Sequence, residues 1–176
     1  MYSILSKIKD QIKDAVIILY DPIDNKKSNG FPEIILSIEE PYEIWIPNLD
    51  YNKVVELYRT TRHYAIGYKL ILDDIYESKI EFTDVSEAFI LFCIFHELAH
   101  WRHMTEFRNP KEWIAEYKHI NYDLGLDNFK SKYNETNDDD KIDFEYQTIY
   151  RNHPFEKRAD QEALRILKEY YYSLDT

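Results

Sequence analysis

The chain has 176 residues, 44% hydrophobic and 16% aromatic, which is enough for the core of one domain spanning residues 1–176. Its formal net charge of −11, from 33 acidic and 22 basic side chains, argues against a nucleic-acid-binding surface and against docking on anionic membranes. The longest apolar run, 88–95, is too short to span a bilayer, and no apolar signal core follows Met1, so we expect a cytoplasmic protein.

The first third of the chain combines a helical pattern with three strand patterns. Apolar residues recur at helical spacing over 2–14, which predicts an amphipathic helix. Short β-branched runs predict strands over 15–20, 33–38 and 42–46. A small N-terminal sheet is therefore expected.

The middle of the chain is helical in character. Apolar spacing indicates a helix from Asp50 onward, whereas 63–76 fits a helix and a strand equally well. A long helix is predicted to reach about Glu106, with Thr83 or Asp84 able to cap its N-terminus. Residues 89–95 are apolar on every side, which indicates a helix buried in the centre of the fold.

The C-terminal part shows two further helix patterns separated by a polar segment. A helix is expected to start at Pro110 and reach about Leu124. Residues 125–143 are polar and acidic and are expected to form a loop; their carboxylates lack the spacing of a calcium-binding EF-hand. A last helix is expected to begin near Pro154, with Asn152 or His153 as its cap. Together the elements predict an α+β fold, mainly helical, around a central helix.

The strongest chemical signal is the sequence H-E-x-x-H at residues 96–100. On a helix, positions i and i+4 share one face, so His96 and His100 can bind the same metal ion. Glu97 lies beside that face and can act as a general base on a water molecule. The motif falls late in the buried central helix, which would hold it rigidly.

A catalytic zinc site usually has three protein ligands, so a third is needed from another element. Glu156 is the best candidate, and Asp160 shares its helix face at i+4. The small residues Ala159 and Ala163 would allow this helix to approach the histidine helix closely. Asp160 then suits hydrogen bonding to a ligand histidine, which would fix its ring orientation. The alternative is an exposed acidic helix face without a ligand.

H-E-x-x-H followed by E-x-x-x-D resembles the gluzincin metallopeptidases, and the short chain with strands ahead of the motif resembles the compact ImmA/IrrE-like zinc peptidases. The resemblance covers residues 89–101 and 154–163. The second motif ends in Asp160, at the place where ImmA/IrrE-like sequences have asparagine. The resemblance implies a zincin-like domain with one Zn²⁺ ion. In such a domain the zinc ligands would be His96, His100 and Glu156. Glu97 would be the general base, and Asp160 would accept a hydrogen bond from a ligand histidine.

Two other side chains near the motif are alternative ligands. His103 lies one turn beyond His100, but an uninterrupted helix would carry it past the ion, so we expect a partly exposed histidine or a substrate contact. The only cysteine, Cys93, would bind zinc as a thiolate, but its apolar surroundings predict a core residue.

The motif predicts a zinc metallopeptidase that hydrolyses a peptide bond of a protein or peptide substrate, with Glu97 taking the proton of the attacking water. Tyr146, Tyr150 and His153 precede Glu156 and are candidates for contacts to the transition state. A zinc amidohydrolase acting on a small amide remains an alternative. So does a regulatory protein with a metallopeptidase fold, although such a protein would not need Glu97.

Overall fold

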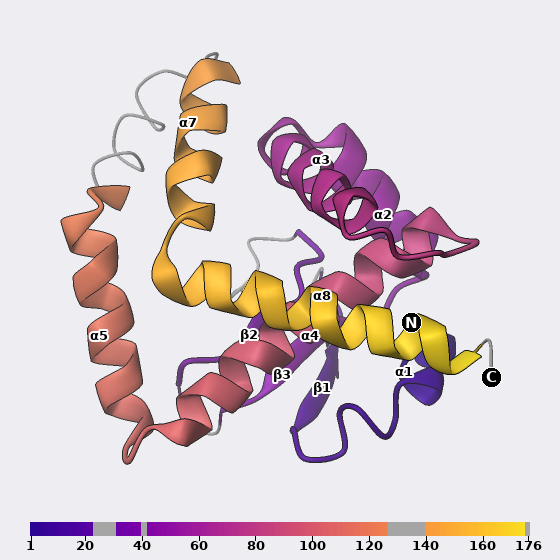
Figure 1. The fold of residues 1–176 in the computed structure, drawn as a ribbon, viewed down its shortest axis with the longest axis horizontal. Coiled ribbons are helices and arrows are strands. Elements are labelled where there is room, and N and C mark those ends of the chain that lie inside the picture. Colours follow the sequence, from indigo (N-terminus) through magenta and orange to yellow (C-terminus); the bar gives the residue numbers. More distant parts are fainter. Residues whose placement is uncertain (23–30, 40–41, 127–139, 175–176) are drawn as a thin grey trace.

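The structure, a computed structural model, describes residues 1–22, 31–39, 42–126 and 140–174. Helices dominate this part of the chain, and three short strands form one small sheet near the N-terminus (Figure 1). The predicted combination of a helical majority with an N-terminal sheet is therefore confirmed.

The sheet contains β1 (Ile17–Tyr20), β2 (Ile35–Leu36) and β3 (Ile44–Pro47) in the order β1-β3-β2. β3 runs parallel to β1 and antiparallel to β2. All three strands lie where the sequence predicts them, but they are shorter than the β-branched runs. Pairing with β3 sets their ends, because a residue outside the hydrogen-bonded ladder is not part of a strand whatever its propensity.

The predicted helix over 2–14 is wrong beyond its first half, since α1 covers only Tyr2–Lys7. The chain continues in turns, with the amide of Gln11 bonded to the carbonyl of Ile8. Ile8 is nevertheless fully buried in the main core. Its apolar spacing therefore reflects tertiary packing rather than a continuous helix.

Among the described residues, six longer helices follow the sheet, with the bounds α2 (Tyr51–Thr60), α3 (Arg62–Glu77), α4 (Val85–Glu106), α5 (Pro110–Asp123), α7 (Asp140–Arg151) and α8 (Pro154–Leu174). The ambiguous range 63–76 is helical, as part of α3. The loop predicted over 125–143 is wrong for its last residues, which begin α7; most of that range lies outside the described residues. The sequence did not indicate α7 because its composition is polar. This composition suits a helix that packs on few neighbours, mainly α3 and α8.

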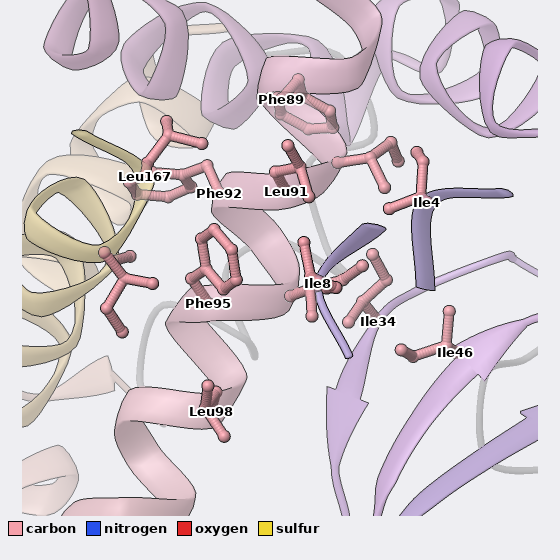
Figure 2. Packing of buried hydrophobic residues seen from close by; sticks show 14 of the residues in the cluster. Ile4, Ile8, Ile34, Ile46, Phe89, Leu91, Phe92, Phe95, Leu98 and Leu167 are labelled. Atoms are coloured by element: carbon pink, nitrogen blue, oxygen red, sulfur yellow. The ribbon is translucent and has the colours of Figure 1, made fainter. Parts of the chain in front are cut away.

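The core is organised around α4, as the sequence predicts. Asp84 caps this helix by accepting hydrogen bonds from the backbone amides of Ser86 and Glu87. Aromatic and aliphatic side chains then leave α4 in every direction and pack against α1, the sheet and α8 (Figure 2). The buried small residues Ala159 and Ala163 lie on α8, which runs alongside α4 (Figure 1).

No helix in the described part of the chain is both long and apolar enough to cross a membrane.

Phe95 provides a test of the central position of α4. Its side chain is completely buried, so Phe95→Ala should lower the free energy of unfolding by about 3–5 kcal/mol through lost apolar burial and the cavity left behind. Tyr122→Ala, at a side chain 73% exposed, should change it by less than about 0.5 kcal/mol. Urea denaturation measures both, and equal midpoints for the two variants would contradict this account of the core.

Candidate metal centre

Two histidines of α4 point their Nε2 atoms at one position. His96 and His100 are separated by one helical turn, and their Nε2 atoms are 3.1 Å apart. The surrounding helix is buried on the opposite side, where Phe95 and Leu98 enter the core. Because α4 is packed on both sides of the motif, the two imidazoles are held by a rigid backbone.

The carboxylate of Glu156 enters the same position from α8. Its Oε2 lies 3.1 Å from Nε2 of His96, and its Oε1 lies 3.4 Å from Nε2 of His100. The residue is only 1% exposed. Ala159 and Ala163, on the side of α8 that is buried, allow the close approach of the helices that this geometry requires.

The three side chains have the spacing of a tetrahedral metal site. Zinc ligands lie about 2.05 Å from the ion, so tetrahedral geometry puts neighbouring ligand atoms about 3.3 Å apart. The two Nε2 atoms are 3.1 Å apart, that of His96 is 3.1 Å from Oε2 of Glu156 and that of His100 is 3.4 Å from Oε1, so each pair is close to this value. Atoms of all three residues lie within 4.8 Å of one another, so the described residues contain a donor set that fits one ion.

Asp160 lies behind His96, one helical turn after Glu156. Its Oδ1 is 2.9 Å from Nδ1 of His96, which places the ring proton on Nδ1 and leaves the Nε2 lone pair for a metal. Arg151, near the end of α7, donates to the other oxygen of Asp160 at 2.9 Å and also pairs with Asp74 of α3. Arg151 thus ties three helices to the histidine. No feature of the sequence pointed to it, because its partners are distant along the chain.

The electrostatics of the cluster favour an ionised Glu156. Burial opposes its charge, but hydrogen bonds from His100 and His96 hold the pKa of Glu156 well below its usual range. Burial likewise opposes protonation of His96, yet the hydrogen bonds to Asp160 and Glu156 raise its pKa well above the ordinary value, so a metal at Nε2 would replace the proton shared with Glu156. The carboxylate is therefore in the form that binds a metal.

The side chain of Glu97 is anchored to the sheet. Its Oε2 accepts a hydrogen bond of 2.8 Å from the backbone amide of Leu36 in β2. Burial raises the pKa of Glu97, opposed by the nearby His96 and His100. The side chain is thus held by the backbone, in an environment that increases its basicity.

A cavity of about 820 Å³ opens beside the cluster. His96, Glu97 and Glu156 line it, together with residues of α2, α3, α5, α7 and the segment before β2. The ligand cluster therefore borders an open space on the side where Glu97 lies. A structural zinc site is closed by four protein ligands, whereas this arrangement keeps one side free.

Tyrosine hydroxyls complete the surroundings of Glu156. Tyr117 of α5 donates a hydrogen bond of 2.5 Å to its Oε1 and lines the cavity, as do Tyr150 and Tyr146 of α7. Burial and the charge of Glu156 raise the pKa of both Tyr117 and Tyr150, so each remains a neutral hydrogen-bond donor. The sequence placed Tyr146 and Tyr150 among the candidates but missed Tyr117, since nothing along the chain connects α5 to Glu156.

His153 is not placed for contact with a substrate. It is completely buried and does not line the cavity. Its Nδ1 accepts a hydrogen bond from the amide of Phe155, and its Nε2 lies 3.3 Å from the carbonyl oxygen of Tyr117. The ring therefore caps the start of α8 and joins it to α5, so the expected contact to the transition state is wrong for this residue.

His103 is 8% exposed and lies among the rings of Phe107, Trp113 and Phe155, so the expectation of a partly exposed histidine is wrong. α5 covers this end of α4, which the sequence did not predict. His103 is not part of the ligand cluster. Cys93 packs against the core and lines the cavity, and burial raises the pKa of its thiol, as expected for a packing residue.

Comparisons with family profiles, with curated proteins and with solved structures return no significant match for this chain.

The geometry predicts an order of metal affinities. Asp160→Ala should weaken zinc binding by about 10–100-fold, because His96 loses the partner that orients it. Glu156→Ala should weaken it more, because a ligand is lost. Glu169→Ala, at an exposed position of the same helix, should leave the affinity unchanged.

Competition with a chromophoric chelator measures these affinities, and far-UV circular dichroism reports whether each variant is folded. A folded Glu156→Ala protein with wild-type zinc affinity would show that the third ligand lies elsewhere.

Proposed function

We propose that this protein is a zinc-dependent metallopeptidase with a zincin-like site. The observation that carries the proposal is the convergence of His96, His100 and Glu156 at the edge of a cavity that Glu97 also lines. Two imidazoles and one carboxylate form a donor set typical of catalytic zinc. The resemblance of the sequence to gluzincin peptidases points in the same direction.

Zinc bound at this site would acidify a water molecule and polarise the carbonyl group of the substrate. Glu97 is the residue that would take the proton of that water, since it lines the cavity and lies between the two histidines in the sequence. The amide of Leu36 holds one oxygen of Glu97, which leaves the other oxygen to accept the proton. After bond cleavage, Glu97 would pass the proton to the leaving amine.

Asp160 and Arg151 would act on the site through His96. Asp160 keeps a proton of His96 on Nδ1, and Arg151 holds Asp160 in place. Tyr117 and Tyr150 supply hydroxyl protons next to Glu156 on the cavity side. A hydroxyl that turned from Glu156 toward the cavity would donate to an oxygen that gains negative charge when the carbonyl is attacked.

The position of β2 favours a peptide over a small amide as substrate. β2 pairs with β3 on one side, and it is an edge strand among the strands that the structure describes. The amide of Leu36 points away from β3 and toward Glu97. An extended peptide bound along this edge would form backbone hydrogen bonds and place its own carbonyl beside the cluster. A zinc amidohydrolase would not need such an edge.

Substitution of the proposed base separates metal binding from catalysis. Glu97→Gln should retain one zinc ion, because the three ligands are unchanged, and should lose at least about 100-fold in kcat, because the proton acceptor is gone. Glu106→Gln removes an exposed carboxylate at the end of the same helix and should keep full activity.

Zinc content is measured by atomic absorption, and activity by mass-spectrometric detection of cleaved peptides from a mixed peptide library. Full activity in the Glu97→Gln protein would refute the mechanism. Absence of any cleavage by the zinc-loaded wild type, with cleavage of small acyl amides instead, would favour the amidohydrolase.

A further inference from the structure

Away from the ligand cluster, one wall of the cavity is aromatic. Tyr58 of α2 and Tyr64 and Tyr68 of α3 line it. Phe31 stacks on Tyr64 with ring centroids 3.7 Å apart and planes nearly parallel, and Tyr58 meets Tyr64 edge-on at 5.4 Å. These contacts fix the orientation of the rings, so the wall is preformed.

Glu33 lies in this wall, just before β2. Its Oε1 accepts a hydrogen bond of 2.5 Å from the hydroxyl of Tyr64, and its carbonyl oxygen accepts one of 2.6 Å from Tyr20. Both the side chain and the backbone of Glu33 are therefore anchored. Burial raises the pKa of Glu33, opposed by the hydrogen bond from Tyr64. No lysine, arginine or histidine among the described residues forms an ion pair with it.

The other charges around the cavity do not compensate Glu33. Arg151 lines the cavity but is held by Asp74 and Asp160. Asp143, also in the lining, is 3.5 Å from Arg62. Glu33 is thus a carboxylate that faces the cavity from a partly buried position, beside ring faces that are themselves electron-rich.

We propose that Glu33 and the tyrosines around it form a subsite for a lysine or arginine side chain of the substrate. This inference rests on the proposed peptidase function. A cation at this position would interact with the carboxylate and with the ring faces of Tyr58 and Tyr64, while its methylene stem would lie along apolar lining residues such as Ile71. A desolvated carboxylate beside aromatic rings discriminates against neutral side chains, which would leave its charge unpaired.

Chain geometry limits where the basic residue lies in the substrate. Glu33 is three residues from Leu36, whose amide contacts Glu97, and three residues span at most about 10 Å. An extended peptide covers this distance with about three residues. The basic side chain therefore belongs to a residue within about three positions of the cleaved bond.

Matched peptides test the subsite in the full-length, zinc-loaded chain. A sequence found to be cleaved in a mixed peptide library is resynthesised with lysine or with its uncharged isostere norleucine at each of three positions on either side of the cleaved bond. At one position the lysine peptide should have a kcat/KM at least about tenfold higher than the norleucine peptide. Tenfold corresponds to about 1.4 kcal/mol, and a partly buried cation that contacts both an aromatic ring and a carboxylate supplies that much.

Glu33→Gln should reduce this ratio to near one, and Glu81→Gln, an exposed site with the same change in net charge, should leave it unchanged. The ratio of the two kcat/KM values is measured on one protein preparation. If a variant is less completely folded, both values fall by the same factor and their ratio is unchanged. A lysine preference that survives Glu33→Gln, or ratios near one at every position in the wild type, would overturn the subsite while leaving the peptidase function intact.

If the library shows no cleavage, the proposed function fails and the subsite is decided by binding. Fluorescence anisotropy then compares labelled alanine-rich pentapeptides with a central lysine or norleucine. Tighter binding of the lysine peptide that is lost in Glu33→Gln supports the cation subsite, and equal binding of the two peptides overturns it.

Discussion

The close packing of α8 against α4 is the contact on which the rest of the site depends. Ala159 and Ala163 lie in this interface, and small side chains let the two helix axes approach. Only this approach brings Glu156 within 3.1 Å of His96, although 60 positions separate them in the chain. A larger side chain at either alanine would move the third donor away from the two histidines.

Placing charged groups in a buried interface is costly unless they satisfy one another. Here each charge has a partner from a different helix: Glu156 meets the histidines of α4 and Tyr117 of α5, and Asp160 meets His96 and Arg151. The network couples α4, α5, α7 and α8. Its polar groups are oriented by these contacts, so the cluster does not need to rearrange in order to bind an ion.

The remaining elements build the cavity rather than the cluster. β2 contributes the amide that holds Glu97 and the segment before β2 contributes the carboxylate of Glu33, whereas α2 and α3 contribute the aromatic wall. One short stretch of chain therefore connects the proposed base to the proposed cation subsite. Recognition of the substrate and positioning of the base are linked through the same edge of the sheet.

By itself, the sequence determined the parts of this protein that depend on local spacing. The i and i+4 spacing of His96 and His100 and the apolar run before them predicted the central helix, and Glu156 with Asp160 could be named because they too share one helix face. The N-terminal strands were located from their β-branched runs, but not their ends. Tertiary structure alone decided the arrangement of distant segments: Tyr117 and Arg151 at the cluster, α5 over His103, and Glu33 in the lining of the cavity that Glu97 also lines. These residues carry no periodic signal, because their roles come from which helices pack together rather than from their neighbours along the chain.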